Sequence, residues 1–374
     1  MPALINPKPN LEPFDRPKET TESLDWAPLA IIDLSAFDSP GGKEALARQL
    51  KDALTRWGFW VVTGTGIPQE QVDRQLAIAN AFFKLPIEEK RKVPCDFSVG
   101  NYFGYREPTR FIGNTDVKEN MEMLNLPKST PDYDSVPRHE FIKTFQDEIA
   151  PFHRLVWENV IRKLFVLFAI ILELPENYFV DRHSYDVPSE DHLRYMIYHP
   201  RSAEDDKKIN EQWSVGHTDF GQWSLTLLFA QTVAALQIRT PDNEWKWVKP
   251  VEGGITCNAA DTISFLTKGY IKSTVHRVVR PPADQTHLER LGLFYFARPG
   301  DDVPMLPAPS PVLRREGFLT KEDETASEED AVKGYEYVRA RVKNVHDRKA
   351  TRIAVNTEDT VFKVKNLAVQ DLYL

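Results

Sequence analysis

A histidine and an aspartate, His217 and Asp219, are separated by a single residue in the stretch S-V-G-H-T-D-F-G-Q-W. Side chains two positions apart in a β-strand point to the same face, so this imidazole and this carboxylate can reach one point. The pair could hold a metal ion, or it could be a turn with an exposed aspartate. Because H-x-D arises readily by chance, the metal interpretation requires a third ligand elsewhere in the chain.

His276 is the third candidate, in the stretch K-S-T-V-H-R-V-V, whose β-branched residues predict another strand. Two histidines and one carboxylate make the facial triad of non-haem iron oxygenases, which leaves coordination positions open for a co-substrate and dioxygen. A barrel of short strands can bring such distant residues together. Zinc hydrolysis is the competing chemistry, but the sequence has neither H-E-x-x-H nor paired C-x-x-C. Without its neighbours, His276 would more simply be a strand histidine hydrogen-bonded to the backbone.

The elements that must position these groups lie in residues 191–300. This segment has short runs of alternating or β-branched residues, among them L-R-Y-M-I-Y, S-L-T-L-L-F-A, D-T-I-S-F-L-T and L-G-L-F-Y-F-A. Gly, Pro, Asn and Asp separate the runs at fairly regular intervals, which is typical of an all-β sandwich or barrel.

The N-terminal half is predicted to be largely helical. Apolar residues recur at helical spacing over residues 43–57 and 69–84, and the longest helical pattern covers residues 138–174, with an interruption near Pro151. Residues 95–127 have scattered Gly, Asn, Tyr and Pro and predict a long loop region, of the kind that is often functional.

Composition and charge limit the partners of the protein. The chain has 374 residues, of which 41% are hydrophobic and 27% charged, which is ample for a sizeable core. The net charge of −8 disfavours nucleic acid or an anionic membrane as a partner. Two cysteines, no signal-peptide pattern and a longest apolar run too short to span a bilayer favour a reduced, cytoplasmic protein.

The stretch from Gly216 to Val279 closely resembles the core of the isopenicillin N synthase-like branch of the Fe(II)/2-oxoglutarate-dependent oxygenases. The resemblance is an ordered series: H-T-D-x-G, L-T-L-L, L-Q-I, W-x-x-V-x-P, N-x-x-D and G-Y-I-K-S-T-V-H-R-V. Upstream, P-L-A-I-I-D-L-S-A-F, A-F-F-K-L-P-I-E-E-K and G-N-Y-F-G-Y look like the helical N-terminal domain of this branch. The tail M-L-P-A-P-S-P-V-L-R-R-E-G-F looks like that of members from filamentous fungi.

The resemblance implies an α+β fold, with a double-stranded β-helix (jelly-roll) core and a helical N-terminal region packed around it. It implies that His217, Asp219 and His276 hold Fe(II), that 2-oxoglutarate and dioxygen are co-substrates, and that ascorbate helps in vitro. The expected organisation is an extended arm (1–27), an N-terminal dioxygenase region (28–135), a long helical backbone (136–190), the catalytic core (191–300), and a linker, helix and tail (301–374).

The resemblance also implies a cation for the distal carboxylate of 2-oxoglutarate. The family has an Arg-x-Ser pair, which here is Arg290 followed by Gly292 in place of the serine. Tyr198 is the candidate to replace the lost hydroxyl; it lies in an Asn-x-Tyr position that has Met196 instead of the Asn. Tyr198 could also be an ordinary core residue, and Arg290 could be a strand arginine that pairs with Glu289 or with solvent. In isopenicillin N synthase the matching groups hold the substrate carboxylate, so Arg290 alone does not identify the acid.

The expected activity is oxidation of a C–H bond in a small molecule, with release of succinate and CO2. A fungal secondary-metabolite intermediate, such as an aromatic polyketide, would be hydroxylated, desaturated or ring-expanded. The expected substrate contacts, beside the M-E-M-L-N-L stretch, are Asn101, Tyr102, Arg106, Phe220 and Trp223. Two alternatives stay open: an oxidase of the isopenicillin N synthase kind that uses no 2-oxoglutarate, and a catalytically silent ligand-binding barrel. The resemblance does not predict the oligomeric state.

Overall fold

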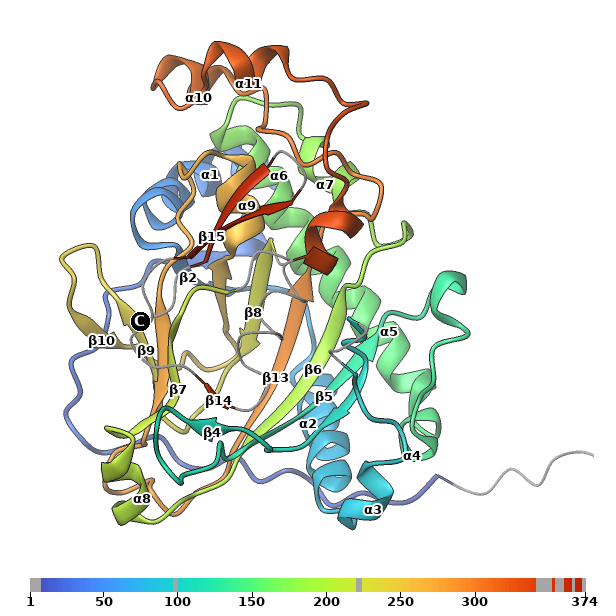
Figure 1. Ribbon diagram of the computed structural model, residues 1–374, viewed down its shortest axis with the longest axis vertical. Coiled ribbons are helices and arrows are strands. Elements are labelled where there is room, and N and C mark those ends of the chain that lie inside the picture. Colours follow the sequence, from blue (N-terminus) through green and yellow to red (C-terminus); the bar gives the residue numbers. More distant parts are fainter. Residues whose placement is uncertain are drawn as a thin grey trace, which may run out of the picture.

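The computed structural model describes, with their side chains, residues 8–96, 100–219 and 224–340, and the backbone alone of 352–353, 360–364 and 367–371. Two sheets organise the chain (Figure 1). The larger has the order β1 (Ile31–Asp33), β2 (Phe59–Thr63), β11 (Ile255–Ala259), β8 (Leu225–Phe229), β13 (Arg290–Ala297), β6 (His192–Tyr198), β5 (Met121–Pro127) and β3 (Gly104–Arg106). The smaller has the order β10 (Trp245–Trp247), β9 (Leu236–Arg239), β12 (His276–Val279) and β7 (Gln212–His217).

The period-2 pattern of the central strands sorts their side chains between two environments. On β6, Leu193, Tyr195 and Ile197 belong to the main hydrophobic core, whereas the alternate residues Met196 and Tyr198 face a cavity between the two sheets. Strand β13 pairs antiparallel with β6 and alternates in the same way. The sheet therefore presents a continuous apolar face to the helices and a mixed polar and apolar face to the cavity.

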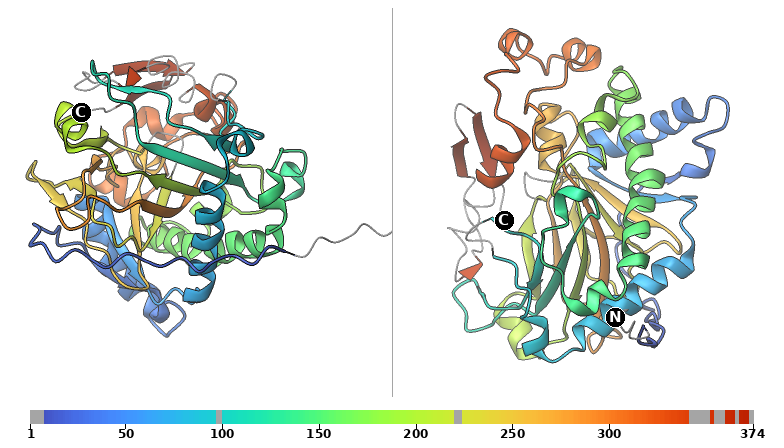
Figure 2. Two further views of the ribbon diagram at one scale, coloured as in Figure 1. Left: turned by 90° about the horizontal axis from the view of Figure 1, so that it is seen from below. Right: turned by 90° about the vertical axis from the view of Figure 1, so that its right-hand side faces the viewer.

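Helices cover the outer face of the larger sheet (Figure 2). The main ones are α1 (Gly42–Asp52), α2 (Gln69–Phe83), α5 (Gln146–Val156) and α6 (Arg162–Ile171), with π-helical turns at Ala53–Trp57 and Trp157–Ile161. Helix α2 buries Val72, Leu76, Ala79 and Phe83, which recur at helical spacing against the sheet. Two sheets with helices on the outer face of the larger one confirm the expected α+β fold.

Three sequence-based expectations about local structure were wrong. Residues 95–127 are not one long loop, because β3, β4 (Phe111–Ile112) and β5 occupy much of the segment and β5 pairs with β6 along its whole length. Most residues of β5 are buried, so their alternation is hidden in the sequence. The stretch D-T-I-S-F-L-T forms α9 (Asp261–Leu266), which buries Ile263 and Leu266 three positions apart.

The third concerns Pro151, which lies inside α5 rather than at a break. The helical pattern is interrupted earlier, at residues 144–145. Pro151 is exposed, so the carbonyl that loses its hydrogen bond one turn earlier can be hydrated.

The remaining elements are short. They are α3 (Ile87–Lys90), α4 (Glu140–Lys143), α7 (Tyr178–Arg182), α8 (Ala203–Lys208), α10 (Pro311–Arg315), α11 (Lys321–Thr325), β14 (Arg352–Ile353), β15 (Thr360–Val364) and β16 (Leu367–Asp371), with 3-10 turns at Leu34–Ala36 and Pro131–Tyr133. Residues 334–340 are also helical, and β14 pairs in parallel with β4.

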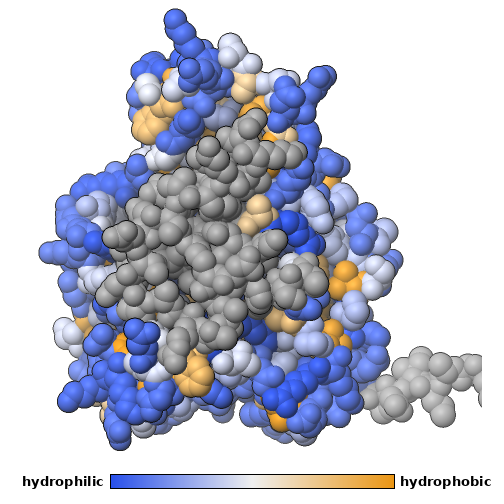
Figure 3. Space-filling view, viewed as in Figure 1, coloured by the Kyte–Doolittle hydropathy of each residue, from blue (hydrophilic) through white to orange (hydrophobic). Residues whose placement is uncertain are grey.

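In Figure 3 the coloured residues are mostly hydrophilic, with hydrophobic ones in small scattered groups. In the part of the chain searched, none of the helices has both the length and the apolar character needed to traverse a membrane.

Candidate active site

His217 and His276 meet across two paired strands. His217 ends β7, His276 begins β12, and the two residues are direct partners in the antiparallel register, with ring centroids 4.5 Å apart. Asp219 follows β7, and its Oδ1 lies 3.5 Å from His276 Nε2. One ligand atom from each of the three residues lies within 4.8 Å of the other two. Within the described ranges, no other cluster of His, Cys, Asp and Glu has a spacing that could hold a metal ion.

Backbone carbonyls orient both imidazoles. His217 Nδ1 lies 2.8 Å from the Val215 carbonyl oxygen, and His276 Nδ1 lies 3.1 Å from that of Thr274. A proton on each Nδ1 satisfies these carbonyls and makes each Nε2 the nitrogen that can ligate a metal. Phe59 packs edge-on against His276, with centroids 5.4 Å apart, and restricts that ring. The donor set of two imidazole nitrogens and one carboxylate oxygen fits Fe(II).

The N-x-x-D motif supports the carboxylate. Asn258 Nδ2 donates to Asp219 Oδ2 at 2.6 Å, and the backbone N–H of Asp261 donates to the Asp219 carbonyl at 3.2 Å. Burial opposes ionisation, but the charges of His276 and His217 and the amide of Asn258 hold the pKa of Asp219 below its ordinary value. Asp219 is therefore an anion with one oxygen already bonded. This supporting role of the N-x-x-D motif is not evident from the sequence alone.

Arg290 and Tyr198 are also register partners, on β13 and β6. The Arg290 guanidinium is buried and lies 5.7 Å from the centre of the Tyr198 ring. Burial lowers the pKa of Arg290. The alternative pairing with Glu289 was wrong, because the Glu289 carboxylate instead accepts from His199 Nδ1 at 3.0 Å. Among the described residues, no carboxylate forms an ion pair with Arg290, so its charge is available to an acid in the cavity.

An aromatic side chain on the same strand explains why Gly292 stands in the place of the family serine. A Cβ at position 292 would lie 2.7 Å from Cε2 of Phe294, two residues along the same face of β13. The Phe294 ring stacks on Phe296, with centroids 5.9 Å apart and planes at 11°. A serine therefore fits only if this aromatic pair moves.

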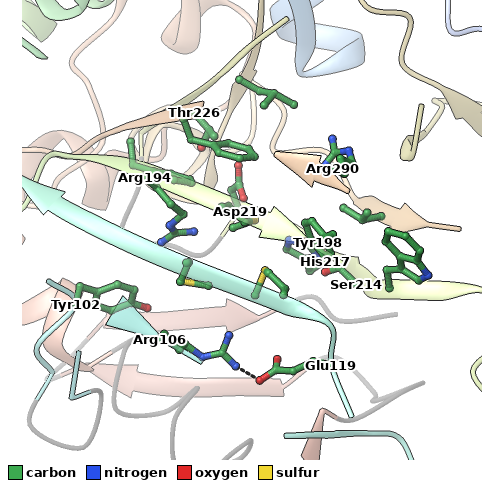
Figure 4. Close-up of a pocket in the computed structure, with 18 of the residues that line it drawn as sticks. Tyr102, Arg106, Glu119, Arg194, Tyr198, Ser214, His217, Asp219, Thr226 and Arg290 are labelled. Atoms are coloured by element: carbon green, nitrogen blue, oxygen red, sulfur yellow. Dashed lines mark hydrogen bonds and ion pairs between the residues drawn. The ribbon is translucent and has the colours of Figure 1, made fainter. Parts of the chain in front are cut away.

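A cavity of about 500 Å³ between the two sheets contains both groups of residues. Its walls include His217, Asp219, Arg290 and Tyr198, which Figure 4 labels. His276 also lines the cavity. Apolar side chains line much of the remainder: Met121, Met123, Met196, Leu228, Leu236, Val278, Phe294 and Phe296. The metal-type cluster and the buried cation therefore open into one largely apolar chamber of the size that small-molecule sites have.

Only some of the residues expected to contact substrate line the cavity. Tyr102 and Arg106 line the cavity. Asn101 does not, because its side-chain oxygen accepts the backbone N–H of Phe103 at 3.1 Å in a tight turn. Phe220 and Trp223 lie outside the described residues.

Arg194 is a cavity residue that the sequence analysis did not single out. Its Nε donates to Asn125 Oδ1 at 2.7 Å, and its guanidinium lies 4.3 Å from the centre of the Phe296 ring. Burial lowers the pKa of Arg194 to about 10, so the side chain stays cationic at neutral pH. The sequence did carry a signal for Arg194. It lies two and four positions before Met196 and Tyr198 on the same predicted strand, so its side chain points to the same face.

Comparison with known proteins agrees with this geometry. Residues 29–144 match the family described as the non-haem dioxygenase in morphine synthesis N-terminal domain, and residues 190–299 match the 2OG-Fe(II) oxygenase superfamily. A UPF0676 protein of Schizosaccharomyces pombe is 31% identical over 295 residues, which are 75% of this chain and 84% of the relative. The chain belongs to the 2OG-Fe(II) oxygenase superfamily.

Two further comparisons extend the relationship. The 2-oxoglutarate-Fe(II) type oxidoreductase hxnY of Emericella nidulans is 27% identical over 307 residues, covering 74% of this chain and 82% of the relative. The crystal structure of a full-length Neurospora crassa protein in complex with alpha-KG superposes with a TM-score of 0.72 at 22% identity, covering 88% of this chain and 99% of the Neurospora chain. This oxygenase is an enzyme, a non-haem dioxygenase that uses Fe(II) and 2-oxoglutarate.

Proposed function

We propose that this oxygenase oxidises a C–H bond of a small organic molecule in fungal secondary metabolism. Hydroxylation, desaturation and ring rearrangement or expansion all fit, and an aromatic polyketide is one example of the substrate. The observation that carries the proposal is the shared cavity, into which the His217–Asp219–His276 cluster and Arg290 both open. The resemblance to the isopenicillin N synthase-like branch supports the metabolic setting.

In this proposal six polar residues of the cavity have assigned tasks. His217, Asp219 and His276 hold Fe(II), which supplies the activation of dioxygen once 2-oxoglutarate and substrate are bound. Arg290 binds the distal carboxylate of 2-oxoglutarate with its planar fork, and the hydroxyl of Tyr198 takes the part of the missing serine. Asn258 fixes the orientation of the Asp219 carboxylate.

The rest of the chamber orients the substrate and excludes water. Met, Leu, Val and Phe side chains on both sheets would cover an apolar substrate body, and Tyr102 and Arg106 offer polar contacts. No side-chain nucleophile is needed, because the chain only holds the reactants in place. Structures of the related Neurospora protein with thymine or 5-formyluracil also contain alpha-KG, which supports a small molecule as substrate.

One alternative assigns the buried arginine to a different acid. In an oxidase of the isopenicillin N synthase kind, Arg290 would bind the carboxylate of the substrate itself, and no succinate would form. A catalytically silent barrel is not favoured, because all three ligand side chains and the buried arginine are present and converge on the cavity.

The test has two stages. Anaerobic titration with Fe(II) and 2-oxoglutarate should produce the visible charge-transfer absorption of the chelate only when both are added. Aerobic screening of aromatic polyketide and terpenoid intermediates with labelled 2-oxoglutarate should then identify a compound that raises succinate formation. A product formed without succinate would favour the oxidase, and no absorption with both additions would contradict the proposed function.

A further inference from the structure

Arg106 has a guanidinium nitrogen that the protein leaves without a hydrogen bond. Arg106 ends β3, the edge strand of the larger sheet, and lines the same cavity as the metal-type cluster. Only 8% of the residue is exposed. Its Nη2 donates to Glu119, whereas its buried Nη1 has no partner among the described residues (Figure 4). A buried charged donor without an acceptor is costly, which points to a ligand that supplies one.

Two arginines share one carboxylate at this end of the cavity. Glu119 is shared, because it also accepts from Arg110 Nη2 at 3.0 Å and from the backbone N–H groups of Thr109 and Arg110. Burial opposes its ionisation, but the charges of Arg106 and Arg110 lower the pKa of Glu119 to about 2. One carboxylate thus faces two guanidiniums, and Arg194 adds a third positive charge to the cavity wall. Buried charge of one sign is unfavourable unless a partner compensates it.

The position of Arg106 separates it from the 2-oxoglutarate site. Arg290 begins β13 beside Tyr198, whereas Arg106 lies two strands beyond β6, next to Met123 of β5. From Arg106 toward β13, Met123 and Met196 follow as successive register partners, and both line the cavity. An apolar body that lies against this wall could reach the metal with one end and Arg106 with the other.

This inference rests on the proposed function and names the substrate class. We propose that the substrate is an organic acid with an apolar body, and that Arg106 binds its carboxylate through Nη1. Glu119 is a positioning residue that holds Nη2 and so turns Nη1 toward the ligand. The planar fork of arginine suits a carboxylate, and the single excess charge of the Arg106–Glu119–Arg110 group matches a monoanion.

Ligand binding can test this without knowledge of the natural substrate. The probes are 4-phenylbutyrate and 2-naphthylacetate, each with its methyl ester, added anaerobically to enzyme that holds Fe(II) and saturating 2-oxoglutarate. Calorimetry gives the Kd, and the chelate absorption reports the metal site. We expect each acid to bind at least about tenfold more tightly than its ester. Equal binding of acid and ester by the unaltered enzyme would overturn the proposal.

Variants assign the preference to one residue. Arg106→Gln should remove the preference for acids while leaving the 2-oxoglutarate titration unchanged, and Arg106→Lys should keep part of it. Arg91→Gln is the matched control: Arg91 also lines the cavity but is paired with Glu107 at 2.7 Å, and this variant should keep the full preference. Should either Arg106 variant bind the acids as the unaltered enzyme does, the assignment is wrong. Loss of the chelate absorption in the unaltered enzyme would instead contradict the proposed function.

Discussion

His217 and His276 are cross-strand partners, and this pairing brings together two of the three side chains of the candidate metal site. β12 pairs with β9 on its other side, and its register against β7 shifts between His276 and Val278. Since a slip of one residue turns every side chain to the opposite face, the two imidazoles converge only in the register observed. Strand pairing therefore fixes the positions of the two imidazoles relative to one another.

His217→Ala should abolish Fe(II) binding and turnover. The substitution leaves two protein ligands, which would bind Fe(II) too weakly to compete with its hydration by water. Anaerobic Fe(II) titration and succinate formation measure the two effects. His287→Gln, which alters an exposed histidine, is the control and should retain both. Full activity in His217→Ala would refute the ligand assignment.

Asn258→Ala should weaken metal binding by about 10- to 100-fold without unfolding the protein. The amide donates to Asp219 Oδ2 at 2.6 Å, so its removal frees the carboxylate to rotate and leaves a buried oxygen without a donor. The Kd for Fe(II), measured by competition with a chelator, reports the change. Asn159→Ala removes a comparable amide that donates to the Thr65 carbonyl and should leave the Kd unaltered. An unchanged Kd in Asn258→Ala would mean that the packing alone orients Asp219.

Arg290→Gln should raise the 2-oxoglutarate requirement strongly. The glutamine loses a charge-assisted pair of hydrogen bonds worth about 2–4 kcal/mol, or about 30- to 1000-fold in concentration. The dependence of the chelate absorption on 2-oxoglutarate measures this directly. Arg290→Lys keeps the positive charge but loses the planar guanidinium. Its 2-oxoglutarate requirement should lie between those of the unaltered enzyme and Arg290→Gln. A requirement unchanged in Arg290→Gln would remove Arg290 from its role.

Gly292→Ser should destabilise the enzyme instead of improving 2-oxoglutarate binding. The new Cβ would lie 2.7 Å from the Phe294 ring, and such overpacking typically costs about 1–3 kcal/mol. The free energy of unfolding in urea, measured for the unaltered enzyme, Gly292→Ser, Phe294→Leu and the double variant, gives a complete double-mutant cycle. The smaller leucine should recover much of the loss, so the two changes should be non-additive. Additive losses would show that Phe294 is not what excludes the serine.

The His217–Asp219–His276 group and Arg290 could be predicted from the sequence, because both are recognised by residue type and by order along the chain. An H-x-D pair, a later strand histidine and an arginine on a further strand define an ordered pattern, and the jelly-roll expectation that follows from it is confirmed. The helices were predictable from apolar spacing, as in α2. What these features share is that their signal is local or periodic.

Features that depend on contacts between residues distant in the chain, or on side-chain orientation, could not be predicted from the sequence. The clash between Gly292 and Phe294 depends on a ring orientation, and the sharing of Glu119 by Arg106 and Arg110 depends on how β3 meets β5. β5 itself escaped prediction because burial on both faces removes the alternation that identifies a strand.

A half-buried histidine that directly follows β6 gives the enzyme a pH-dependent stability. His199 Nε2 lies 2.8 Å from Glu122 Oε1, and its Nδ1 lies 3.0 Å from Glu289 Oε1. Glu122 also accepts from Lys90 and from the hydroxyl of Tyr105. The hydrogen bond to Glu122, opposed by partial burial and aided by Glu289, raises the pKa of His199 above its ordinary value.

The sign of the effect follows from linkage. A pKa raised by folding means that the folded state holds the proton more tightly, so the stabilisation is complete below the ordinary histidine pKa of about 6.5 and is lost as the pH rises through the raised value. Urea unfolding of the unaltered enzyme and His199→Gln should therefore differ more at pH 6 than at pH 9. Glu289→Gln removes one of the two carboxylates and should reduce that pH dependence. A difference between the enzyme and His199→Gln that stays constant from pH 6 to 9 would contradict the ion-pair assignment, because only the protonated imidazole bonds both carboxylates.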